Sequence, residues 1–206
     1  MISKKQETIP AGKSEQVLQA AMQLFSEKGF EKTSMRDLAK AADMTTAGLY
    51  YHIQSKDHLL KVIEDIIFNQ LQATVFTKMG QSGEPKRRLR DFIEAMIDYS
   101  LEHAKLVSVL RDNAITEEFA EEIREHRKLY VKQTEEFLKQ LQRDAKVEPR
   151  VDATVVTYIL IATMNWLPLW YKAGGRLSKK QLVDAVSQFF IKGLLDGSKR
   201  TRGSGQ

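Results

Sequence analysis

The 206-residue sequence predicts an all-α protein of about nine helices, arranged as a small N-terminal three-helix domain and a larger C-terminal helical domain. Three observations predict this class. Apolar residues recur three and four positions apart along most of the chain, which is the spacing of one face of an α-helix. Glycine, serine and threonine stand where these stretches end and begin. We find no convincing strand pattern and no internal repeat.

The N-terminal domain is predicted to hold three helices, with a fourth leading out of it. The first helix ends at Gly29, a natural helix C-cap. Each later helix starts after a hydroxyl side chain that can cap it. The capping residues are Ser34, which forms a capping box with Asp37, then Thr45 or Thr46, and finally Ser55. Between the second and third helices, Asp43 is expected to take a turn conformation that asparagine, aspartate or glycine tolerates.

The C-terminal domain follows a glycine-containing boundary at residues 78–85. It is predicted to contain an amphipathic helix, a short helix, a long charged helix, an apolar helix over about 150–171 and a last helix over 178–197. Pro168 is expected to kink or end the apolar helix. The predicted division is a flexible N-terminus (1–12), a first domain (13–55) joined by a linking helix (56–78), a second domain (56–198) and a flexible tail (199–206).

The composition sets limits on function. The net charge of +5 is a weak indication of an anionic partner. The absence of cysteine excludes disulfides and thiolate metal sites, and it fits a reducing cytosol. The N-terminal lysines are not followed by an apolar stretch, so we expect no signal peptide.

Residues 153–171 carry no charge and are long enough to be a membrane-span candidate. The run is interrupted by three threonines, an asparagine and a proline, and amphipathic helices stand on both sides of it. We therefore expect no membrane span. A helix that is apolar all round is instead expected to serve both an internal core and a subunit interface.

The helix, short helix, turn and short helix within about fifty residues form the helix-turn-helix arrangement, whose second short helix enters the DNA major groove. Ala47 and Gly48 are small enough to let that helix approach the bases. Leu49 and Ile53, four apart, form its inward face. Its two adjacent tyrosines are therefore expected to face DNA.

Residues 14–60 resemble the DNA-binding domain of the tetracycline-repressor (TetR) family. The matching residues are Phe25, Gly29, Phe30, Thr33, Ser34, Leu38, Ala39, Leu49, Tyr50, His52, Ser55, Lys56 and Leu59. The chain departs from the family pattern at Ile53, where an aromatic residue is usual, and at Asp43-Met44, where Gly-Val is common. We expect Ile53 to pack in the core all the same.

This resemblance implies a set of DNA-binding residues. Phosphates would be held by Thr33, Ser34, Tyr50, His52 and Lys56. Base edges would be read by Arg36, Thr45, Thr46, Ala47 and Tyr51, with Gly48 allowing close approach.

The C-terminal part is similar to a subgroup of the family that regulates fatty-acid and steroid catabolism and responds to acyl-CoA thioesters. The shared residues are Asn165, Trp170, Tyr171, Gly175, Arg176, Leu177, Ser178, Gly193 and Leu194. Candidate ligand-binding residues are Phe92, Met96, Tyr99, Leu110, Arg111, Tyr130, Asn165, Trp166 and Trp170. Further candidate cations for the phosphates of coenzyme A are Arg87, Arg88, Arg124, Arg127 and Lys128. The alternative is that these apolar residues are core and these cations lie on solvated faces.

The resemblance implies a cytoplasmic homodimer, joined through helices at about 150–171 and 178–197, that represses transcription from a palindromic operator until a small molecule releases it. An acyl-CoA thioester is the favoured effector; a cationic or aromatic drug, with efflux as the regulated process, is the alternative. We expect no cofactor, no catalytic set and no metal site, although His103 or His126 beside Glu102 or Glu125 is a weak metal alternative.

Overall fold

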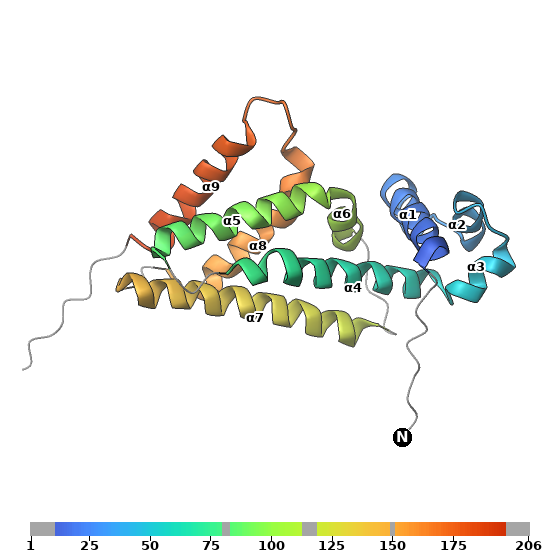
Figure 1. Ribbon diagram of the computed structural model, residues 1–206, viewed down its shortest axis with the longest axis horizontal. Coiled ribbons are helices and arrows are strands. Elements are labelled where there is room, and N and C mark those ends of the chain that lie inside the picture. Colours follow the sequence, from blue (N-terminus) through green and yellow to red (C-terminus); the bar gives the residue numbers. More distant parts are fainter. Residues whose placement is uncertain (1–10, 80–82, 113–118, 149–150, 197–206) are drawn as a thin grey trace, which may run out of the picture. The chain divides into compact units, whose positions relative to one another are not determined.

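The computed structural model describes residues 11–79, 83–112, 119–148 and 151–196, and these ranges are predominantly helical (Figure 1). Nine α-helices and the short 3₁₀-helix η1 (Phe76–Lys78) make up the regular structure of the described ranges. The α-helices are α1 (Ala11–Lys28), α2 (Met35–Ala41), α3 (Thr46–His52), α4 (Lys56–Thr74), α5 (Pro85–Glu102), α6 (Ala104–Asp112), α7 (Ala120–Ala145), α8 (Ala153–Trp170) and α9 (Lys179–Leu194). The all-α prediction is confirmed.

The chain divides into two compact units. The N-terminal unit contains the residues up to Ile67 together with Lys105–Ile123, and the C-terminal unit contains Phe68–Ala104 and the residues from Arg124 onward. Helix α4 begins in the first unit and ends in the second. The predicted domains over 13–55 and 56–198, and the linking helix over 56–78, stay predictions. Of the two predicted flexible ends, 1–12 and 199–206, only residues 11 and 12 belong to the described part, where they open α1.

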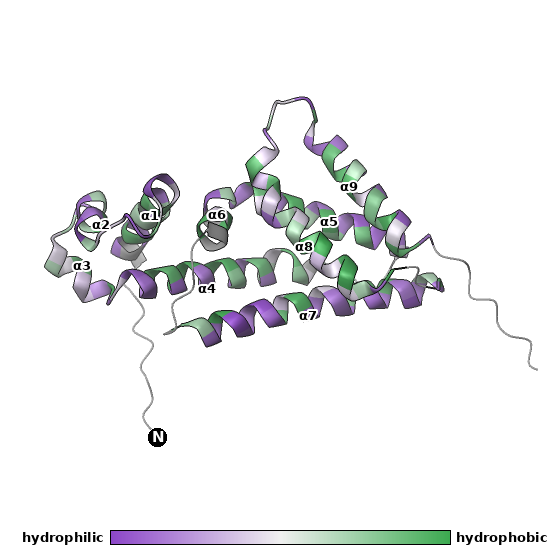
Figure 2. Ribbon diagram, turned by 180° about the vertical axis from the view of Figure 1, so that it is seen from behind, coloured by the Kyte–Doolittle hydropathy of each residue, from purple (hydrophilic) through white to green (hydrophobic). Residues whose placement is uncertain are grey.

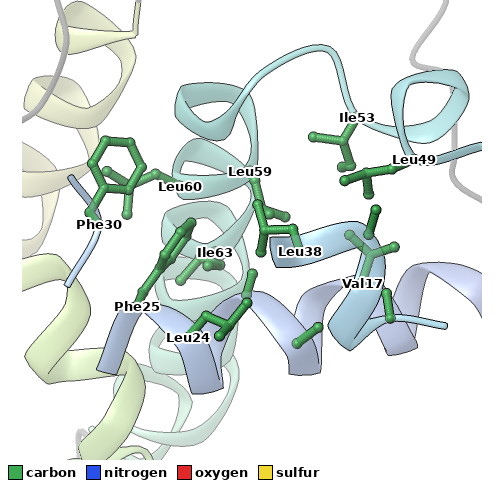
Figure 3. Packing of buried hydrophobic residues seen from close by; sticks show 14 of the residues in the cluster. Val17, Leu24, Phe25, Phe30, Leu38, Leu49, Ile53, Leu59, Leu60 and Ile63 are labelled. Carbon is green, nitrogen blue, oxygen red and sulfur yellow. The ribbon is translucent and has the colours of Figure 1, made fainter. Parts of the chain in front are cut away.

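One hydrophobic cluster holds the N-terminal unit together (Figure 3). Leu38 of α2 and Leu49 of α3 are fully buried in it, as is Ile63 of α4. Ile53 is buried as well, so both residues predicted to face inward from the third helix do so. Burying one such side chain contributes about 1.5–3 kcal/mol. Val109 of α6 joins the same cluster, which explains why residues 105–123 belong to this unit.

The helix ends of the N-terminal unit are set by the predicted capping residues. Gly29 follows α1 with φ +83°, a conformation that glycine adopts without strain. Ser34 and Asp37 form the reciprocal capping box at α2. The hydroxyls of Thr45 and Ser55 each accept a hydrogen bond from the backbone N–H three residues on, at 3.0 Å in both cases. Each cap contributes about 0.5–2 kcal/mol to helix stability.

Asp43 has φ +52°, which confirms the expected turn conformation between α2 and α3. Aspartate and asparagine tolerate the left-handed region, whereas a β-branched residue is strained there by about 1–2 kcal/mol. We expect Asp43→Val to lower the free energy of unfolding by about that amount and Asp43→Asn to leave it nearly unchanged. Urea unfolding of both variants measures this, and equal stability of the two would contradict the strain argument.

In the C-terminal unit, α5 packs against α8 and α9, which also contact each other (Figure 1). One face of α5 is fully buried, with apolar residues three and four positions apart as the sequence predicted. These residues are Leu89, Phe92, Ile93, Met96 and Ile97. The rings of Phe92 and Phe137 lie 4.8 Å apart and join α5 to α7. The core of this unit is therefore built around α5.

Helix α8 is mostly hydrophobic, whereas hydrophilic residues dominate α7 (Figure 2). Among the described residues, α8 is the one helix whose length and composition would suit a membrane span, and 33% of it is buried inside the chain. Asp152 caps its start by accepting hydrogen bonds from the backbone N–H groups of Thr154 and Val155. The helix ends at Trp170, two residues after Pro168, as the proline predicted.

Candidate nucleic-acid interface

Helix α3 presents an aromatic outer face. Leu49 anchors the helix in the core, and the two tyrosines that follow it point outward: Tyr50 is 52% exposed and Tyr51 84% exposed. The half-buried ring of His52 meets the ring of Tyr51 edge-on, with centroids 5.2 Å apart. The expectation that these tyrosines avoid the core is confirmed, and their contact with DNA stays a prediction.

The start of α3 combines an N-cap with small residues. Thr46 and Ala47 are exposed. A Cβ atom on Gly48 would lie 3.0 Å from the Thr45 hydroxyl, which accepts the hydrogen bond from the Gly48 N–H. Glycine at this position therefore leaves room for the cap of α3, a structural reason beside close approach to DNA.

The two hydroxyls before α2 have different surroundings. Thr33 is 1% exposed, and its hydroxyl donates a 2.8 Å hydrogen bond to the carbonyl of Gly29. The Thr33 hydroxyl is therefore buried and already bonded, and the predicted phosphate contact of Thr33 stays a prediction. The exposed Ser34 hydroxyl donates a 2.7 Å hydrogen bond to the carboxylate of Asp37. The hydrogen bonds from Ser34 lower the pKa of Asp37, which keeps a negative charge beside Ser34.

Lys56 has a structural role that the sequence did not indicate. Its ammonium donates a 2.9 Å hydrogen bond to the carbonyl of Phe30 and lies 3.4 Å from the carbonyl of Glu31. The same ammonium lies 4.5 Å from the centre of the Phe30 ring. Lys56 therefore ties the first turn of α4 to the connection between α1 and α2. An ammonium group has three N–H donors, so Lys56 can still donate to a phosphate while it contacts these two carbonyls. Its predicted phosphate contact therefore stays a prediction.

Replacing Lys56 by methionine is expected to lower the free energy of unfolding by about 1–3 kcal/mol, because the Phe30 carbonyl loses a charge-assisted hydrogen bond. The matched control is Lys32→Met, since Lys32 is exposed. Chemical denaturation compares the two variants. If Lys56→Met is as stable as Lys32→Met, the structural role of Lys56 is contradicted.

An open depression of about 390 Å³ lies between α2 and the start of α3. It is lined by Arg36, Ala39, Lys40, Asp43, Met44, Thr45 and Thr46. Three of these, Arg36, Thr45 and Thr46, were predicted to read base edges. Lys40 and Asp43 were missed. Lys40 stands four residues after Arg36, and this spacing would have placed it on the same face of the helix as Arg36.

The candidate effector-binding residues of the C-terminal unit separate into two groups. Phe92, Met96 and Tyr99 are buried, and the Phe76 ring contacts both Phe92, at 6.1 Å, and Tyr130, at 5.8 Å. Burial raises the pKa of the Tyr99 and Tyr130 hydroxyls, so both remain protonated hydrogen-bond donors. Three of the predicted residues, Phe92, Met96 and Tyr99, therefore lie in the interior, and the half-buried Tyr130 lies beside Phe76.

The second group does not lie in the interior. Trp166 is 59% exposed and Trp170 is 54% exposed, and Asn165 is exposed as well. These three α8 residues therefore lie outside the core of the single chain, because α8 buries its other face against α5 and α9. Their predicted contact with a ligand stays a prediction. The side chains of Leu110 and Arg111 lie outside the described residues.

The guanidinium of Arg88 is buried and paired with Asp144. It donates a 2.6 Å hydrogen bond to Asp144 and lies 5.7 Å from the centre of the Phe137 ring. Arg87 and Lys128 lie on exposed faces beside Asp91 and Glu125. Arg88 is therefore a structural residue rather than a phosphate ligand.

The Arg88–Asp144 pair predicts a specific dependence of stability on pH. The hydrogen bond from Arg88 is the largest cause that lowers the pKa of Asp144 in the folded chain. Because the unfolded value is higher, about 3.9, the contribution of the pair is complete above that pH and is lost as the pH falls through the folded pKa. The Tm of the wild type should fall more steeply below about pH 4 than the Tm of Asp144→Asn. Parallel curves would contradict this.

A helix-turn-helix unit with an exposed aromatic recognition helix, joined to a helical body, defines a DNA-binding transcriptional regulator. The family model described as bacterial regulatory proteins, tetR family, matches residues 17–63. A second model, described as tetracyclin repressor-like, C-terminal domain, matches residues 82–194. The chain belongs to the TetR family.

Several relatives share most of the chain. The HTH-type transcriptional repressor KstR2 of Mycolicibacterium smegmatis is 28% identical over 207 residues, which cover 94% of each chain. The structure of AibR in complex with isovaleryl coenzyme A and operator DNA has a TM-score of 0.76 at 29% identity, covering 86% of this chain and 97% of AibR. The TetR family regulator PfmR of Thermus thermophilus has a TM-score of 0.73 at 26% identity, covering 89% of this chain and 99% of PfmR.

Proposed function

We propose that this protein is a cytoplasmic, homodimeric repressor that a small-molecule effector, favoured to be an acyl-CoA thioester, releases from a palindromic operator. The observation that carries the DNA-binding part is the aromatic face of α3, which is exposed beside a fully buried Leu49. An exposed aromatic face beside a buried anchor suits a binding surface, and the major groove accepts one helix.

In this proposal each subunit inserts the start of α3 into one of two successive major grooves, about 34–36 Å apart. Tyr51, Thr46 and Ala47 would meet base edges. Tyr50 and His52 would hold the flanking phosphates, which fix the register of the helix on DNA.

The dimer would form through α8 and α9. Large apolar side chains on these helices remain exposed in the single chain. They are more numerous than the single, scattered apolar residues that are normal on a protein surface. They are Val155, Tyr158, Ile159, Trp166, Leu169, Trp170 and Phe189. Covering them with the same face of a second copy gives a two-fold interface.

The acyl-CoA proposal rests on two supports. Phe92 and Met96 are buried and the half-buried Tyr130 contacts the Phe76 ring, so this region offers the apolar surface and the hydroxyl donor that an acyl chain and its carbonyl require. The AibR relative was crystallised with isovaleryl coenzyme A, which is an acyl thioester. The effector would shift the protein between DNA-bound and released conformations by its difference in affinity for the two.

The test combines thermal unfolding with binding to DNA from upstream of the protein's own gene. Short- and long-chain acyl-CoAs are compared with free coenzyme A, free fatty acids and cationic drugs. A ligand at a hundredfold excess over its Kd adds about 2.7 kcal/mol of stability. We expect an acyl-CoA both to raise the Tm and to release the DNA. If only the drugs do so, the alternative of an efflux regulator replaces the acyl-CoA proposal; if no DNA is bound even at low salt, the operator proposal fails.

A further inference from the structure

The depression between α2 and α3 carries two uncommitted cations on one wall. Arg36 and Lys40 lie four residues apart on α2, and both are exposed. Within the described part of the chain, neither has an ion pair, whereas Lys28 is paired with Asp37 and Lys61 with Asp65. Their donors are therefore available to an acceptor that enters the depression.

The turn adds an acceptor to the same depression. Asp43 is exposed, lines the depression and has no ion pair among the described residues. Its left-handed φ of +52° is fixed by the turn, whose Asp43 N–H donates to the carbonyl of Lys40. A carboxylate repels a phosphate, so a depression that combines Arg36 with Asp43 suits a ligand edge that offers both acceptors and a donor.

A G·C base pair offers that combination in the major groove. Guanine presents two acceptors, O6 and N7, and cytosine presents the N4 amino donor. Arginine pairs with the two guanine acceptors through two parallel hydrogen bonds, and a carboxylate accepts from the cytosine amine. The buried Ala39 and half-buried Met44 complete the depression with apolar surface.

We propose that the α2–α3 depression reads one G·C pair in each operator half-site, with Arg36 on the guanine and Asp43 on the cytosine amine. Lys40 neutralises a phosphate beside that pair. This inference rests on the proposed operator binding and assigns one of its specificity elements to α2 and the turn. The half-site then extends past the base pairs that α3 alone reaches.

The test begins with duplexes that the wild-type protein selects from a random library of about 30 base pairs, a length of roughly three helical turns. Each base pair of the selected half-site is then changed in turn, and Kd is measured for the wild type, Arg36→Ala, Asp43→Gly, Lys40→Ala and the control Lys32→Ala. Asp43→Gly removes the side-chain acceptor and adopts the φ of +52° without strain, and thermal unfolding checks that every variant is folded.

We expect the wild type to lose about 5- to 100-fold in affinity when one particular G·C pair is replaced. Arg36→Ala and Asp43→Gly should lose that preference and keep the preferences at the other positions. Lys40→Ala should weaken binding to all duplexes equally and lower the slope of log Kd against log salt concentration by about one, with Lys32→Ala keeping the complete profile. If Arg36→Ala and Asp43→Gly keep the wild-type profile, the inference is overturned while operator binding stands; if the wild type selects no duplex, operator binding itself fails.

Discussion

Tyr51→Ala is expected to weaken operator binding on the order of tenfold per half-site, and up to about a hundredfold for a symmetric operator, without lowering the stability of the fold. The reason is the geometry of α3: the side chain is 84% exposed, so its removal leaves no cavity. A single contact to a charged or base-edge group contributes about 1.5 kcal/mol, and each half-site would lose one. Fluorescence anisotropy with the selected operator measures the affinity, and urea unfolding measures the stability.

The control for Tyr51 is the inward face of the same helix. Leu49→Ala removes a fully buried side chain from the cluster of the N-terminal unit and should lower the free energy of unfolding by about 2–5 kcal/mol. Both variants would lose DNA binding, but only Leu49→Ala would lose stability. Wild-type affinity in Tyr51→Ala would show that α3 does not read DNA through this residue.

Placing charges on the exposed face of α8 and α9 is expected to convert the proposed dimer into monomers. Tyr158→Glu combined with Phe189→Glu puts one carboxylate on α8 and one on α9, at side chains that are 57% and 66% exposed in the single chain. Burying either charge in an interface without a partner is costly. Light scattering coupled to size exclusion reports the change in mass.

Loss of the dimer carries a second expectation for DNA binding. Two linked reading units bind a palindrome tighter than one by about 10²- to 10⁴-fold, because the second binding event is intramolecular. The double variant should therefore bind the complete operator about as weakly as a single half-site. Leu129→Glu is the control, since Leu129 is an exposed apolar residue of α7 and belongs to neither α8 nor α9. A dimeric double variant would place the interface elsewhere.

The sequence by itself determined the elements of the N-terminal unit and their ends. The cap Ser34, a cap at Thr45 or Thr46 and the turn conformation of Asp43 were predicted because their interactions join residues no more than about four positions apart, and the structure uses Thr45. The inward face of Leu49 and Ile53 followed from the helical period in the same way.

Only the tertiary structure decided the roles of residues whose partners are distant in sequence. Lys56 was predicted as a phosphate ligand, but its ammonium meets a carbonyl 26 residues away. The apolar helix α8 has no polar face, so its sequence could not indicate that Trp166 and Trp170 point outward and Leu167 inward. Packing against α5 and α9 settled that choice, because a periodic pattern assigns an inner face only where polar residues mark the outer one.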